Sequence, residues 1–150
     1  MKTIFDKATA IEIIDRINTL NSGSKREWGK MNLFQMLKHC VIWTEWVMGK
    51  NNYKYKQEFI GYLFGKIVLK GIMKDDRIMK RGMPAGRDFE VRENGDNIEL
   101  QKRTLINLIQ GYECYSNSGF IHDFFGKMTR EQIGVFAYKH YDHHLRQFGS

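Results

Sequence analysis

Four long stretches of this chain repeat apolar residues at three- or four-residue spacing, the period of one face of an α-helix. The first follows Asp6, a residue type favoured as an N-cap. The second and the last open with capping boxes, Asn32 with Gln35 and Thr129 with Gln132, in which each residue's side chain binds the backbone N–H of the other. Runs of strand-type alternation are too short to compete. The chain is therefore predicted to be all-α.

The third stretch begins at Asp96 or Asn97, after a connection of nearly fifty residues that contains the only proline, Pro84. Within this connection, residues 58–73 are predicted to form a short helix interrupted by glycines. Long connections in compact domains are usually functional, and we expect this one to cap one end of the fold. The pattern predicts one domain, residues 1–150: a four-helix bundle with a long crossover, holding a short extra helix, between the second and third helices.

The net charge of +7 is concentrated in the segment 50–81, which has nine Lys or Arg against Glu58, Asp75 and Asp76. Such a surplus of six could attract an anionic ligand, a nucleic acid or a lipid surface. A solvated basic face is the simpler interpretation, and we do not expect nucleic-acid binding.

The start of the chain has no apolar core of signal-peptide length, so an oxidising compartment is not implied and Cys40 and Cys114 are interpreted as reduced thiols. The most apolar run, 59–73, is broken by Lys66 and Lys70 and is shorter than the ~20 residues of a spanning helix. We therefore expect a cytoplasmic protein with no membrane partner.

Three of the five histidines fall in the last predicted helix, whose inward stripe starts at Ile133 and continues to His140 and His144. Side chains four residues apart can both reach one metal ion. His143 lies at the edge of this stripe, about 60° round the helix. On the second helix, His39 lies on or beside the buried face and offers a third imidazole. The same spacing also fits a hydrogen-bonded core histidine and a chance HxxxH pair.

Other candidates carry weaker signals. His122, in the loop before the last helix, could approach the mouth of such a site, although loop histidines usually face solvent. Trp43 could wall a pocket or simply fill the core. Arg146 could bind an anionic substrate group or lie on the surface. Asp142 points away from the stripe and is a poor ligand, so no carboxylate presents itself as a general base and the catalytic residues stay unknown.

Four segments together resemble the DinB/YfiT-like metalloenzymes, particularly a bacterial subfamily known mainly as a domain of unknown function. The resemblance covers both ends of the chain well and residues 74–96 poorly. The segments are IFDKATAIEIIDRI (4–17), WGKMNLFQMLKHC (28–40), FFGKMTREQIG (124–134) and YKHYDHHLRQFG (138–149).

This resemblance implies helices in up-down-down-up order and a divalent metal held by His39, His140 and His144. It also implies activities that range from transfer dependent on a low-molecular-weight thiol (mycothiol, bacillithiol or glutathione) to none identified. Three imidazoles suit zinc, nickel, iron or copper.

Two functional hypotheses follow. The first is a metal-dependent hydrolase or thiol S-transferase that acts on a small-molecule substrate. The second is a non-catalytic protein that binds a small ligand in the same cavity, or an anionic partner through 50–81. A homodimer formed through an exposed helix face is left open.

Overall fold

The computed structural model describes residues 1–82 and 86–150, so Pro84 lies outside the described residues. The prediction of a mainly α-helical chain is confirmed. The long elements are α1 (Lys7–Thr19), α2 (Leu33–Met48), α3 (Phe59–Ile72), α4 (Ile98–Gln110) and α5 (Arg130–Arg146). Short 3-10 turns η1 (Lys50–Asn52), η2 (Arg87–Phe89) and η3 (Gly111–Cys114) and a small antiparallel pair, β1 (Ile121–His122) and β2 (Gly126–Lys127), complete the described elements.

The predicted helix starts are confirmed at the two capping boxes. The Asn32 side chain accepts from the Gln35 backbone N–H at 2.9 Å, and Thr129 Oγ1 accepts from the Gln132 backbone N–H at 3.2 Å. Asn97 caps α4 by accepting from the Leu100 N–H. These caps fix where α2, α4 and α5 begin, and hence which residues each helix turns inward.

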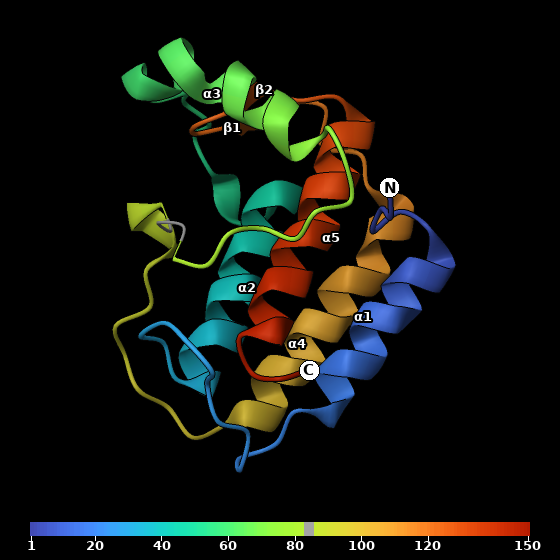
Figure 1. Cartoon of the computed structure of the whole chain (residues 1–150), viewed down its shortest axis with the longest axis vertical. Helices are drawn as coiled ribbons and strands as arrows, with labels where there is room; N and C mark the ends of the chain where they lie inside the picture. The colour runs from blue at the N-terminus through green and yellow to red at the C-terminus, as the bar shows by residue number, and fades with distance from the viewer. Residues whose placement is uncertain (83–85) are drawn as a thin grey trace.

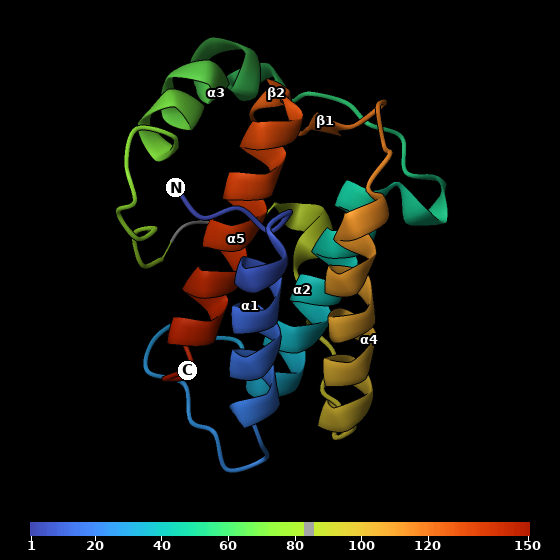
Figure 2. The same cartoon turned by 90° about the vertical axis from the view of Figure 1, so that its right-hand side faces the viewer.

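The helices α1, α2, α4 and α5 lie side by side, with α4 packed against both α1 and α2 and α5 against α1 (Figure 1). Turning the molecule shows α3 lying across one end of these helices, next to β2 (Figure 2). The rest of the crossover returns along α2, where Gln35 Nε2 donates to the Glu93 carbonyl. The crossover therefore covers one end, as expected, and also one flank. Within the described residues, no helix is both long enough and apolar enough to span a bilayer.

A chain of buried hydroxyl groups links α5 to α2 and to the 3-10 turn η3 that follows α4. Thr44 Oγ1 donates to the Cys40 carbonyl at 2.6 Å, so the Tyr141 hydroxyl donates to Thr44 at 2.6 Å. The Tyr112 hydroxyl in turn lies 3.1 Å from that of Tyr141. Because each hydroxyl has a hydrogen-bond partner, these polar groups can be buried in the core. The bonds also favour one rotation of α5 about its own axis.

Lys102 of α4 does not point outward, although lysine is usually a surface residue. Its side chain is buried, and Nζ donates to the carbonyl oxygens of Leu20 at 2.7 Å and Asn18 at 3.3 Å, with Glu99 3.1 Å away. The reason is the packing of α4 against α1, which brings Lys102 to the orphan carbonyls at the end of α1.

Candidate metal centre

The structure brings together the three histidines that the helical phase selects. His39 from α2 and His140 and His144 from α5 are all buried, and one ring nitrogen of each lies within 4.8 Å of the other two. The Nε2 atoms of His39 and His140 are 3.1 Å apart. Two imidazole nitrogens bound to one ion at about 2.0 to 2.1 Å would be separated by roughly 3.0 to 3.4 Å. The spacing thus matches a shared metal ion.

Two of the rings have a hydrogen-bonded Nδ1, which leaves Nε2 as the nitrogen available to bind an ion. His39 Nδ1–H donates to the backbone carbonyl of Phe89, in the crossover, at 2.8 Å. His144 Nδ1–H donates to Gln147 Oε1 at 3.2 Å, and Gln147 Nε2 donates to the Trp28 carbonyl at 2.9 Å. A hydrogen bond at Nδ1 fixes the tautomer and orients the ring of a ligating histidine. The core-histidine alternative also fits His39, because its Nε2 lies within hydrogen-bond distance of His140 Nε2.

The sequence reasoning missed both of these outer partners. Gln147 lies three residues after His144 on the same helix face, so its spacing was a usable signal. Phe89 acts through its backbone carbonyl, a group that every residue carries, and nothing in the sequence marks it.

Burial holds all three imidazoles in the neutral form. It lowers the pKa of His39, and it lowers the pKa of His140 and of His144 well below the ordinary value, with the neighbouring histidines acting in the same direction. A histidine must be neutral to bind a metal. The cluster is therefore ready to accept an ion at neutral pH without first losing protons.

Trp43 both fills the core and packs against a candidate ligand. Its ring stacks on His140 at a centroid distance of 4.1 Å and an interplanar angle of 25°, and it is almost fully buried. Trp43 therefore fills the core, and its role as a pocket wall stays a prediction. Cys40 is buried in the core on another face of α2, burial raises the pKa of its thiol, and it does not join the ligand group.

The two remaining histidines stand outside the ligand group. His143 is an edge residue, as predicted: it is buried, its ring meets Trp28 edge-on at 6.0 Å, and its pKa is lowered by burial and then by Arg146. The expectation of a solvent-facing His122 is wrong, because this ring is buried in β1 against Phe125, at 4.3 Å. The aromatic residues of the β1–β2 turn cover it.

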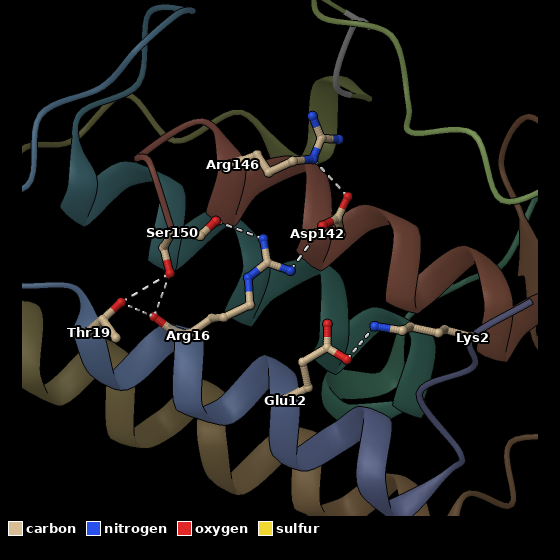
Figure 3. A network of polar contacts seen from close by, with 7 residues as sticks. All are labelled: Lys2, Glu12, Arg16, Thr19, Asp142, Arg146 and Ser150. Atoms are coloured by element: carbon tan, nitrogen blue, oxygen red, sulfur yellow. Dashed lines mark hydrogen bonds and ion pairs between the residues drawn. The ribbon is translucent and has the colours of Figure 1, made fainter.

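A polar network on the opposite side of α5 accounts for Asp142 and Arg146 (Figure 3). Asp142 accepts from Arg16 Nη1 through Oδ1 and from Arg146 Nε through Oδ2, each at 2.9 Å. Arg16 also donates to the Ser150 carbonyl at 2.8 Å. Asp142 is thus directed away from the histidines, as predicted. The Arg146 charge is paired rather than lying free on the surface, and a role with an anionic substrate stays a prediction.

The fold and the site define a mainly helical protein with a buried three-histidine cluster of metal-ligand geometry. The family described as "Protein of unknown function (DUF1569)" matches residues 5–150, so the chain belongs to this family. No curated protein and no solved structure shows a significant match to the chain.

Proposed function

We propose that this protein is an enzyme that binds one divalent transition-metal ion through His39, His140 and His144 and acts on a small molecule. The observation that carries the proposal is the convergence of the three ring nitrogens, two of them on rings oriented through Nδ1. With three protein ligands the site resembles open catalytic metal sites more than closed four-ligand structural ones. A divalent ion held by these three histidines would supply a Lewis acid to activate a water or thiol nucleophile.

The residues around the histidines suit thiol-dependent transfer better than hydrolysis. Among the described residues, no carboxylate joins the ligand group to act as a base. An ordinary thiol, with a pKa of about 8.5, ionises more readily than free water, and a bound metal would lower the pKa of either nucleophile further. A low-molecular-weight thiol is therefore the proposed cosubstrate.

We also propose that α1, α2, α4 and α5 form a four-helix bundle of the DinB/YfiT-like type in up-down-down-up order. Support comes from the long crossover between α2 and α4, and from candidate ligands on the second and last of these helices. The bacterial, cytoplasmic setting implied by the same resemblance belongs to this proposal.

One observation favours the non-catalytic alternative. A cavity that His144 lines together with Cys40 and Tyr141 holds only about 10 Å³, room for roughly one water molecule. A substrate would have to reach the ion by another path or by movement of the crossover. A protein that holds the metal without turnover would not need such a path.

Metal binding is tested by titrating the purified, chelator-stripped protein with zinc, nickel, iron or cobalt and measuring bound metal. We expect one ion per chain, lost in His140→Ala and retained in His143→Ala, which removes a buried histidine of the same helix that lies outside the ligand group. Equal metal content in wild type and His140→Ala would refute the site.

Catalysis is tested separately with the metal-loaded protein, glutathione, bacillithiol or mycothiol, and an electrophilic acceptor. A rate that needs both metal and thiol, and that disappears in His140→Ala, supports the enzyme. Stoichiometric metal binding with no rate for any thiol or ester substrate supports the non-catalytic alternative.

A further inference from the structure

The outward face of α3 is built from large apolar side chains that no described residue covers. Phe59 is 78% exposed, Ile67 71% and Tyr62 69%. The exposed apolar residues of this helix are Phe59, Ile60, Tyr62, Leu63, Phe64, Ile67 and Val68. A contiguous apolar surface of this kind on a folded protein marks an interaction site.

The inward face explains why the large side chains point outward. Gly61, Gly65 and Leu69, at four-residue spacing, form the buried stripe of α3. A Cβ added at Gly61 or Gly65 would come within 2.3 or 2.1 Å of the Phe124 carbonyl oxygen, so only glycine allows the helix to lie this close to the β1–β2 turn. The smallest residues therefore face the protein and the largest face outward.

The helix is also firmly attached at both ends. At its start, the Glu58 N–H donates to the Asp123 carbonyl at 2.7 Å. At its end, the buried Lys139 of α5 donates to the carbonyls of Ile72, Asp75 and Arg77 at 2.6 to 3.0 Å. These hydrogen bonds hold α3 in place on the protein, so its apolar face has a fixed position.

The charge around α3 indicates what covers this face. The helix has no acidic residue, and Lys66 and Lys70 lie on it, exposed. Exposed Lys54, Lys56 and Lys74 flank its two ends. The whole segment 50–81 carries six more positive than negative side chains. If a second copy docked through this face, the positive segments of the two copies would repel each other. An anionic lipid surface would instead attract the positive charge of this segment.

We infer that α3 is an in-plane membrane anchor that binds the surface of an anionic lipid bilayer. An outward apolar face with lysines beside it is the arrangement of helices that lie in the interface with their apolar side chains in the headgroup and acyl boundary. The sequence predicted no membrane partner because 59–73 is too short to cross a bilayer. A helix parallel to the surface does not need that length.

The test is cosedimentation of the full-length protein with phosphatidylcholine vesicles that contain phosphatidylserine, and with phosphatidylcholine alone. We expect binding to the anionic vesicles that weakens as salt rises. Phe59→Ser with Ile67→Ser lowers the partition coefficient by about 10-fold or more for each residue, because each side chain loses its burial. Lys54→Gln with Lys70→Gln lowers it by about 5-fold for each lysine.

Matched controls are Leu100→Ser, an exposed apolar residue in the first turn of α4, and Lys25→Gln, an exposed lysine in the loop after α1. The start of α4 and the loop after α1 lie at the end of the molecule opposite α3 (Figure 1), so both variants should bind like wild type. Circular dichroism and urea unfolding check that each variant is folded.

Three outcomes overturn the inference: no binding to anionic vesicles, equal binding to phosphatidylcholine alone, or binding unchanged by the Phe59 and Ile67 substitutions. Light scattering identifies the competing occupant. A wild-type dimer that fails to bind vesicles and that becomes monomeric with Ile67→Ser would assign the face to a second copy.

Discussion

Gln147 is the outer residue whose removal tests the candidate metal centre most directly. It accepts from His144 Nδ1–H and donates to the Trp28 carbonyl, and it is buried. Gln147→Met keeps the length and flexibility of the side chain but removes both polar groups. The His144 ring then loses the bond that directs its Nε2 toward His39 and His140. Loss of such an outer partner typically weakens metal affinity 10- to 100-fold, or about 1.4 to 2.7 kcal/mol.

The same change leaves the Trp28 carbonyl without its side-chain donor, so the metal-free protein should lose about 1 kcal/mol of unfolding free energy. Gln147→Glu separates the two effects. The carboxylate still accepts from His144 Nδ1–H, so metal affinity is kept, but it cannot donate to Trp28, so the stability loss remains.

The assay is competition of zinc or cobalt between the protein and a chromophoric chelator, combined with urea unfolding in excess chelator. A double-mutant cycle of Gln147→Met and His144→Ala supplies the control. When His144 is already replaced by alanine, Gln147→Met should have no further effect on metal affinity. Wild-type affinity in Gln147→Met, or an equal loss with His144 absent, would refute the proposed role of Gln147.

Three further outcomes are expected. Thr129→Ala removes the N-cap of α5 and lowers the unfolding free energy by about 1 kcal/mol in urea melts; an unchanged midpoint would contradict its capping role. Lys139→Met leaves the carbonyls at the end of α3 without their donor, so hydrogen exchange should speed up in α3 and not in α1. Burial lowers the pKa of His39, His140 and His144 below the ordinary 6.5, so below that pH the unfolded chain binds protons that the folded chain does not. The metal-free protein should therefore lose stability as pH falls from 6.5, by up to about 1.4 kcal/mol per pH unit for each histidine, whereas urea midpoints independent of pH between 7 and 5 would contradict it.

Most of the site could be predicted because the start of a helix and its 3.6-residue period together decide which residues face inward. The capping box at Thr129 sets where α5 starts, and the 3.6-residue period then separates His140 and His144 from His143. His39 could be added because α2 has an equally clear start and a well-defined apolar stripe. Each of these inferences used only residues on one helix.

What could not be predicted depends on contacts between distant segments. Lys102 and Lys139 have the side chain most typical of a surface, yet both are buried because helix ends supply several carbonyl acceptors around them. His122 is buried because the β1–β2 turn folds back on its aromatic residues. The Phe89 carbonyl reaches His39 only through the path of the crossover, where the sequence resemblance is poor.

The separation of the candidate ligands along the chain has a consequence for folding kinetics. His39 and His140 are 101 residues apart, so closing that loop in the unfolded chain would cost about 4 kcal/mol before an ion gained its full ligand set. If the site binds an ion as proposed, we expect capture to come late, after α2 and α5 have met. We expect added metal to leave the refolding rate nearly unchanged and to slow unfolding, so that it lengthens the lifetime of the native state.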